Sequence, residues 1–145
     1  MEWLNEPPAW KQRGDVLSVT TAPGTDFWRK THDGGIRDTG HAFLMPWRGD
    51  FIAEVAVSAD YRDQYDQAGL MIRLDETVWL KCGIELLDGL HQVSAVVTRD
   101  VSDWSVVPLP TPPATLRPLS TGSAAPSKTA TVWTTGRRRC FARPT

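Results

Sequence analysis

The sequence predicts an all-β protein, an antiparallel sandwich or barrel. Short runs of alternating apolar and polar residues follow one another along the chain, and turn-forming residues separate them. The clearest runs lie in residues 64–85, where two of them are adjacent in the sequence. No stretch has the convincing 3.6-residue apolar period of an amphipathic helix. Strands with this spacing are typical of sandwiches and barrels.

Residues 64–85 predict a hairpin of two strands with one buried face. Apolar residues alternate in both runs, at Ala68, Leu70, Ile72 and Leu74 and then at Leu80, Cys82 and Ile84. A period of two puts such residues on one side of a strand. Asp75, Glu76 and Thr77 form a polar connection short enough for an antiparallel turn. We expect Leu70, Ile72, Leu80 and Ile84 to be buried together between two sheets.

The opposite face of this hairpin is polar and aromatic, which favours a binding surface over a plain solvated face. It carries Tyr65, Gln67, Met71, Arg73, Trp79, Lys81 and Glu85.

Further strands are expected at residues 16–21, 25–30, 42–45, 51–58 and 92–98. Glycine and aspartate separate these runs and supply the backbone conformations that turns need. These positions are Gly24, Gly34, Gly35, Gly40, Gly49, Asp50, Asp88 and Gly89.

Length and charge limit the class of protein. A chain of 145 residues fits one domain. Residues 1–107 hold 10 basic and 17 acidic residues, whereas residues 108–145 hold 6 basic residues and no acid. An acidic body argues against nucleic acid as a partner, because phosphate binding needs clustered Lys and Arg. Two cysteines, no signal peptide and no membrane-length apolar run predict a reduced, cytoplasmic protein without a membrane partner.

Several motifs occur in an order that resembles a known family. They are TDFW (25–28), GHAF (40–43), GDF (49–51), YDQAGLM (65–71), WLKCGIE (79–85), VVT (96–98) and SDWS (102–105). Together they resemble the uncharacterised family related to the fungal regulator of enolase, within the concanavalin A-like lectin and glucanase superfamily. The resemblance runs from about Trp3 to Ser105. It implies a two-sheet jelly-roll sandwich of antiparallel strands and brings no established activity.

Residues 108–145 are predicted to be an irregular tail, which leaves residues 1–107 as an incomplete sandwich domain. The tail is rich in Pro, Thr, Ser, Ala and Arg and has no sustained period. The resemblance also stops near Val107, so the closing strands are expected to be missing or replaced. Two explanations are open, a natural disordered basic tail or a reading-frame slip in the gene. The slip is favoured because the sandwich otherwise lacks strands to cover its apolar face and sheet edges.

Tryptophans beside carboxylates predict a ligand site on the polar face. An indole can pack on the apolar face of a sugar while carboxylates and amides accept its hydroxyl hydrogens. The alternative is that each tryptophan simply packs in the core, and that His41 is a hydrogen-bonded histidine of the sandwich. The residues expected to converge on one groove are Asp26, Trp28, His41, Gln67, Trp79, Lys81, Glu85, Asp103 and Trp104.

Three functions follow from these residues. The first is binding of a carbohydrate or sugar metabolite. The second is a glycoside hydrolase that uses Glu54 and Glu85, if both look into one groove, with Asp26, Asp66 and Asp103 as further candidates. The alternative is that Glu85 pairs with Lys81 and Glu54 is solvated. The third, suggested by the family resemblance, is a protein-interaction module that modulates a metabolic enzyme. No metal or cofactor motif is present, since the three histidines are scattered and no Gly-rich phosphate loop occurs.

Overall fold

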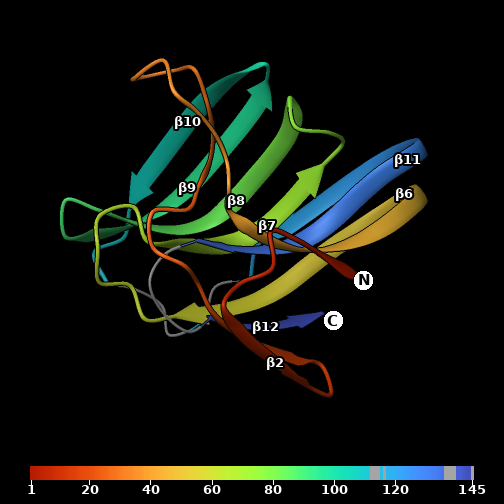
Figure 1. The fold of residues 1–145 in the computed structure, drawn as a ribbon, viewed down its shortest axis with the longest axis horizontal. Coiled ribbons are helices and arrows are strands. Elements are labelled where there is room, and N and C mark those ends of the chain that lie inside the picture. Colours follow the sequence, from red (N-terminus) through yellow and green to blue (C-terminus); the bar gives the residue numbers. More distant parts are fainter. Residues whose placement is uncertain (112–114, 116, 136–139, 145) are drawn as a thin grey trace.

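Figure 1 shows the fold in a computed structural model, which describes residues 1–111, 115, 117–135 and 140–144. These residues form strands, turns and loops, and none of them lies in a helix. None therefore belongs to a helix long and apolar enough to cross a membrane.

Twelve strands are present among the described residues. In chain order they are β1 (Glu2–Leu4), β2 (Ala9–Arg13), β3 (Val16–Thr20), β4 (Phe27–Arg29), β5 (Ile36–Asp38), β6 (His41–Ala59), β7 (Gln67–Arg73), β8 (Val78–Leu87), β9 (Leu90–Arg99), β10 (Val101–Pro108), β11 (Leu119–Thr135) and β12 (Cys140–Pro144).

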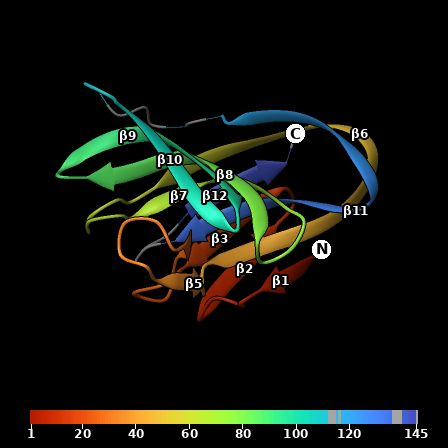
Figure 2. The same ribbon diagram turned by 90° about the horizontal axis from the view of Figure 1, so that it is seen from above.

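The strands form two layers that share the long strand β6. The large sheet has the order β10-β9-β8-β7-β11-β6, with β1 paired to the first residues of β6. The small sheet contains β2, β3, β12 and the last residues of β6. Figures 1 and 2 show β6 and β11 running side by side along the molecule. Every pairing is antiparallel, which confirms the expected antiparallel all-β sandwich.

The first apolar core lies between the two sheets. The small sheet and the end of β6 supply Leu17, Val19, Val55 and Val57, and the large sheet supplies Phe43, Ala68 and Leu70. The predicted inner face of the 64–85 hairpin is confirmed for Leu70 and Ile84, which are buried. Ile72 and Leu80 are only half-buried, because they lie toward the end of the hairpin where β7 turns into β8.

A second apolar core lies on the other face of the large sheet. It contains Phe27, Ala42, Met71, Trp79 and Val96. Phe27 comes from the two-stranded β4–β5 ribbon, here called the covering hairpin, which lies across this face. The large sheet is therefore buried on both sides along β7, whose side chains are nearly all inaccessible. The face that the sequence marks as polar is mostly covered instead of solvated.

Two close approaches require glycine. Gly69 and Gly83 are register partners on β7 and β8, and a Cβ on either would lie about 2 Å from backbone of the neighbouring strand. At Gly40, a Cβ would come within 2.4 Å of the Phe27 ring. Glycine at position 40 thus leaves the space in which the covering hairpin buries Phe27.

The C-terminal segment differs from its prediction. Residues 119–135 and 140–144 form β11 and β12, so the expectation of an irregular tail is wrong for these residues. β11 is an interior strand whose backbone pairs with β6 on one side and β7 on the other. Such pairing uses main-chain groups and needs no apolar alternation. The reading-frame slip and the division at residue 107 stay predictions. Residues 112–114, 116, 136–139 and 145 lie outside the described residues.

Truncating Leu70 tests the core between the sheets. Leu70 is 3% exposed, so Leu70→Ala should lower the free energy of unfolding by about 2–5 kcal/mol, because it removes apolar contacts and leaves a cavity. Ile52→Ala is the matched control, since Ile52 is 75% exposed and its truncation should change the free energy by less than about 0.5 kcal/mol. Chemical denaturation measures both, and equal losses would contradict the assigned inner face.

Candidate functional site

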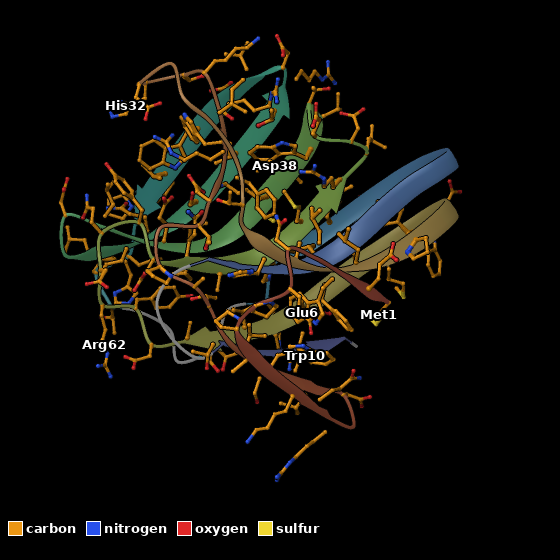
Figure 3. All side chains as sticks on the ribbon, viewed as in Figure 1. Met1, Glu6, Trp10, His32, Asp38 and Arg62 are labelled. Carbon is orange, nitrogen blue, oxygen red and sulfur yellow. The ribbon has the colours of Figure 1, made fainter. Side chains whose placement is uncertain are left out.

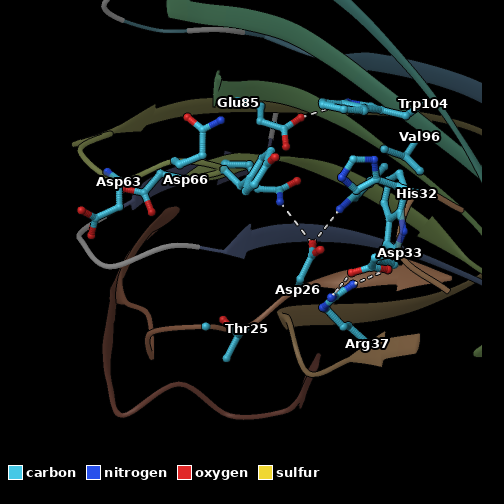
Figure 4. A pocket seen from close by; sticks show the side chains of 16 residues that line it. Thr25, Asp26, His32, Asp33, Arg37, Asp63, Asp66, Glu85, Val96 and Trp104 are labelled. Atoms are coloured by element: carbon cyan, nitrogen blue, oxygen red, sulfur yellow. Dashed lines mark hydrogen bonds and ion pairs between the residues drawn. The ribbon is translucent and has the colours of Figure 1, made fainter. Parts of the chain in front are cut away.

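One pocket lies between the covering hairpin and the polar face of the large sheet (Figure 4). Its volume is about 430 Å³, which is within the usual range for small-molecule sites. The hairpin and its flanks, the large sheet, and the loop that precedes β7 each form part of its wall. The lining residues are Gly24, Thr25, Asp26, Trp28, His32, Asp33, Arg37, Asp63, Gln64, Tyr65, Asp66, Gln67, Lys81, Glu85, Val96 and Trp104.

The covering hairpin forms one wall because its own turn and its ion pairs hold it in place. Asp33 accepts a hydrogen bond from the Gly35 amide and pairs with Arg37. The Arg37 guanidinium lowers the pKa of the Asp33 carboxyl to about 2. At the other end of the hairpin, Arg73 of β7 donates two hydrogen bonds to Asp38, at 2.6 and 2.8 Å. Figure 3 shows Asp38 lying over the large sheet and His32 in the turn of the hairpin.

Asp26 is the centre of a polar network that joins the hairpin to the sheet. Its Oδ1 accepts hydrogen bonds from Lys81 Nζ at 3.0 Å and Gln67 Nε2 at 3.2 Å. The Lys81 ammonium also donates to the Phe27 carbonyl at 2.8 Å and is only 3% exposed. A buried ammonium is stable when carboxylate and carbonyl oxygens replace its water. The network therefore fixes one end of the pocket.

Glu85, four residues after Lys81 on β8, forms a second polar group. Its Oε2 accepts a hydrogen bond from Trp104 Nε1 at 3.1 Å, and the same indole N–H also points at Ser94 Oγ at 3.1 Å. Burial raises the pKa of Glu85 above its ordinary value, while the hydrogen bond with Ser94 and the charge of Lys81 oppose the shift. Desolvation disfavours the ionised carboxylate, so Glu85 is a group whose charge responds to its surroundings.

Two indoles form an aromatic corner of the pocket. The rings of Trp28 on β4 and Trp104 on β10 meet at 88°, with centroids 6.1 Å apart. Trp28 Nε1 donates to the Thr31 carbonyl, and Trp104 Nε1 is held by Glu85 and Ser94. Because each N–H has a partner, both rings are fixed in orientation.

The loop before β7 forms the remaining wall. Asp66 stabilises this loop, because its Oδ2 accepts hydrogen bonds from the backbone N–H groups of Arg62 and Asp63. Tyr65 adopts a positive φ of 68°, a conformation that non-glycine residues seldom take. Its backbone N–H donates to the Leu86 carbonyl at 2.7 Å. These contacts hold Tyr65 and Asp66 at the pocket.

Six of the nine residues expected to converge do line this pocket. They are Asp26, Trp28, Gln67, Lys81, Glu85 and Trp104. Period two places Gln67, Lys81 and Glu85 on one face of adjacent strands, and the covering hairpin brings Asp26 and Trp28 to that face. Binding of a ligand by these residues stays a prediction.

His41 lies elsewhere, in a structural role. Its ring is buried between two backbone segments, accepting a hydrogen bond from the Ala22 N–H at Nε2 and bonding the Asn5 carbonyl through Nδ1. Both nitrogens therefore have partners, and Nδ1 carries the proton. His41 anchors the N-terminal segment instead of lining the pocket.

Trp79 and Asp103 are also outside the pocket. Trp79 is on the predicted face, but Phe27 of the covering hairpin packs against it and leaves it 3% exposed. Asp103 is the register partner of Val97 on β9, and Val97 belongs to the opposite face of the large sheet. The neighbouring Trp104 faces the pocket because successive side chains of a strand alternate. The expected single groove is thus wrong for His41, Trp79 and Asp103.

The two proposed catalytic carboxyls do not meet in the pocket. Glu54 lies on β6 and forms a surface ion pair with Arg117 at 3.0 Å, and it is absent from the pocket lining. Glu85 lines the pocket, so the two carboxyl groups do not face a common ligand. Among the residues that the structure describes, no group of three or more His, Cys, Asp or Glu side chains is placed to hold a metal ion.

Several lining residues were missed by the sequence. His32, Asp33 and Arg37 reach the pocket because the covering hairpin folds back over the sheet, and only the Gly34-Gly35 turn signalled that hairpin. Tyr65 reaches it through local loop hydrogen bonds, as does Asp66, which the sequence had offered only as a further catalytic candidate. The two-residue alternation placed Tyr65 near the polar face. It gives no information about how the loop before β7 bends toward the covering hairpin.

Comparison with known proteins places the chain in a family. Residues 3–139 match the profile described as protein of unknown function (DUF1349). The chain belongs to this family. The match continues past Val107, where the resemblance was expected to stop, and includes all of β11.

Two curated fungal relatives match this family member over part of their length. It is 44% identical over 103 residues to Regulation of enolase protein 1 of Saccharomyces cerevisiae, covering 71% of this chain and 52% of that protein. It is 38% identical over 105 residues to Uncharacterized protein AN7484 of Emericella nidulans, covering 65% of this chain and 50% of that protein. The chain thus spans about half the length of these relatives.

A crystal structure shares the whole fold. It is that of a functionally unknown protein from Saccharomyces cerevisiae, which is 30% identical to this chain and superposes with a TM-score of 0.84. The alignment covers 98% of this chain and 92% of that chain. The shared fold therefore includes the C-terminal strands.

Replacing Lys81 tests whether its ion pair holds the covering hairpin. Lys81→Met keeps the side-chain length but removes the only cation that pairs with Asp26 among the described residues, leaving hydrogen bonds from Gln67 and the Phe27 N–H. The expected loss in free energy of unfolding is toward the lower end of roughly 3–5 kcal/mol, because the Asp26 side chain keeps 27% exposure. Lys30→Met is the control, since Lys30 pairs with the exposed Asp100 and should cost about 0–1 kcal/mol. Denaturant unfolding measures both, and similar losses would contradict the role of Lys81.

Glu85 should make stability depend on pH. Its pKa is raised in the folded chain, so folded Glu85 keeps a proton at pH values where the unfolded chain has lost it. The stability from this group is present below the ordinary pKa of 4.5 and is lost as pH rises through the higher folded value. The thermal midpoint of the wild type should therefore fall relative to that of Glu85→Gln over this window. A constant difference from about pH 4 to about pH 8 would contradict it.

Proposed function

We propose that the pocket binds a small polyhydroxylated molecule of the carbohydrate class. The observation that carries the proposal is the presence of two oriented indoles, Trp28 and Trp104, in the same cavity as Asp26, Gln67 and Glu85. Indole surfaces pack on the apolar C–H face of a sugar ring, and carboxylate and amide oxygens accept its hydroxyl hydrogens. Such a site gains orientation from the acceptors and contact area from the rings.

The size and rigidity of the pocket support this ligand class. A cavity of about 430 Å³ encloses a small molecule more readily than it does a protein segment. Hydrogen bonds fix Trp28, Trp104 and Gln67 before any ligand arrives, so binding orders few side chains. The resemblance of the sequence to the concanavalin A-like superfamily, which contains lectins, points to the same class.

A second candidate is a regulatory protein-interaction role toward a metabolic enzyme. It is favoured by the 44% identity to the protein named Regulation of enolase protein 1. The two roles are compatible, because a ligand in the pocket contacts both the covering hairpin and the large sheet and can thereby alter the surface that a partner meets. A pull-down of purified enolase with this chain tests the interaction, and no retention at micromolar protein would remove the candidate.

The hydrolase alternative loses its proposed pair of residues. Glycoside hydrolysis uses two carboxyl groups that flank the scissile bond, and Glu54 does not line the pocket with Glu85. Ligand binding is therefore the function that the geometry supports best.

Truncating Trp104 tests carbohydrate binding. A glycan array should first identify a bound sugar, and titration calorimetry should then compare variants. Trp104→Ala removes one indole surface and should weaken binding by roughly 1–3 kcal/mol, by analogy with stacking of bases on aromatic side chains. Trp47→Ala is the control, because Trp47 is 41% exposed and lies outside the pocket lining. The proposal would be contradicted if the Trp104 variant bound the sugar with unchanged affinity, or if no glycan on the array were bound.

A further inference from the structure

The charges that line the pocket bear on which small molecule it accepts, and the inference therefore rests on the proposed function. Among the residues that the structure describes, five carboxyl groups and two permanently charged cations line the cavity. The carboxyls belong to Asp26, Asp33, Asp63, Asp66 and Glu85, and the cations to Lys81 and Arg37. With these groups ionised the lining is negative, which raises the local concentration of cations and repels anions.

Both cations are already bound by carboxylates. Lys81 is held by Asp26 Oδ1 and the Phe27 carbonyl and is 3% exposed. Arg37 pairs with Asp33 in the turn of the covering hairpin. To bind Lys81, a phosphate group would have to draw the ammonium away from Asp26, and breaking a buried ion pair is costly. Arg37 is more exposed, but its guanidinium lies against the Asp33 carboxylate, which repels an anion. The pocket is therefore poorly suited to a sugar phosphate.

One carboxylate oxygen is left for a ligand. Asp26 Oδ1 accepts three hydrogen bonds, from Phe27 N, Gln67 Nε2 and Lys81 Nζ. Within the described part of the chain, Asp26 Oδ2 accepts none. The Asp26 side chain keeps 27% exposure, and Figure 4 shows its carboxylate between the hairpin and the sheet. An ammonium donor would meet a charged acceptor there, and hydrogen bonds between charged groups are the strong ones.

The aromatic corner also favours a cation. Trp28 and Trp104 stand nearly perpendicular, so the cavity presents indole surface on two sides. The face of an indole carries negative electrostatic potential, and organic ammonium groups bind over it. Glu85, hydrogen-bonded to Trp104, places a second carboxyl group on the same side. Aromatic surface and carboxylates together form the environment in which proteins bind ammonium groups.

We infer that the pocket selects a cationic polyhydroxylated ligand, an amino sugar or related aminated polyol, over its neutral and anionic counterparts. The ammonium lies against Asp26 Oδ2 and Glu85, beside the two indoles. The ring packs on indole surface, and its hydroxyl groups hydrogen-bond to the remaining amide and carboxylate oxygens.

Three sugars that share the glucose ring and carry different charges test this inference at pH 7, where the amine of glucosamine is mostly protonated. Glucosamine, glucose and glucose 6-phosphate are titrated into the ¹⁵N-labelled chain, and amide shifts report each affinity. Glucosamine should bind about fivefold to tenfold more tightly than glucose, because a hydrogen bond to a charged group contributes more than a neutral one. Glucose 6-phosphate should bind more weakly than glucose. Added salt should weaken glucosamine binding and leave glucose binding unchanged.

A matched pair of variants locates the effect in the pocket. Glu85→Gln keeps an acceptor for Trp104 and removes the ionisable carboxyl group, so the preference for glucosamine over glucose should fall by about fivefold. Asp103→Asn removes a carboxyl group from the exposed, opposite face of the large sheet and should leave the preference intact. An equal loss in both variants would mean a general field effect and would overturn the assignment to the pocket.

The outcomes separate this inference from the proposed function. Equal binding of glucosamine and glucose, or tighter binding of glucose 6-phosphate, overturns the charge selection but leaves carbohydrate binding in place. Shifts confined to residues outside the pocket, or no shifts with any of the three sugars, overturn both.

Discussion

The ion pair between Lys81 and Asp26 joins the covering hairpin to the large sheet, and the pocket depends on it. Lys81 is buried on β8, while Asp26 precedes β4, 55 positions earlier in the chain. Arg73 with Asp38 and Arg29 with Asp100 fasten the hairpin at two further points. Without these pairs, Phe27 would not stay packed on Trp79, and the space between hairpin and sheet would not be enclosed.

This arrangement explains why polar residues on an antiparallel sheet are buried. Such sheets commonly leave one face in water, and a face with Lys, Arg, Glu and Gln suggests solvent. Here the hairpin covers that face, so each charge needs a partner to offset its lost hydration. Lys81 and Arg73 therefore have structural roles, and the groups left to meet a ligand are the acceptors and the indoles. Among the described residues of the lining, carboxyl groups outnumber cations, and both cations are paired with carboxylates.

The two-residue alternation of side chains along the strands located much of the site. It put Gln67, Lys81 and Glu85 on one face, and the structure places all three at the pocket. It also placed Trp79 on this face, which is correct, but Phe27 covers the indole ring and keeps it out of the pocket. The prediction that Asp103 lines the pocket was wrong, because adjacent residues on a strand face opposite sides and its neighbour Trp104 faces the pocket. The C-terminal strands were missed because β11 is held by main-chain pairing with β6 and β7, which an apolar pattern does not record.

The sequence by itself determined the all-β class, the hairpin in residues 64–85 with its two distinct faces, and the family. These depend on local alternation and on motifs that lie within single strands. Only the tertiary structure decided that the covering hairpin encloses the polar face, that His41 anchors the N-terminal segment, and that Glu54 is remote from the pocket lining. The physical reason is that these facts depend on contacts between residues far apart in the chain. Strand periodicity says which way a side chain points and nothing about what lies opposite it.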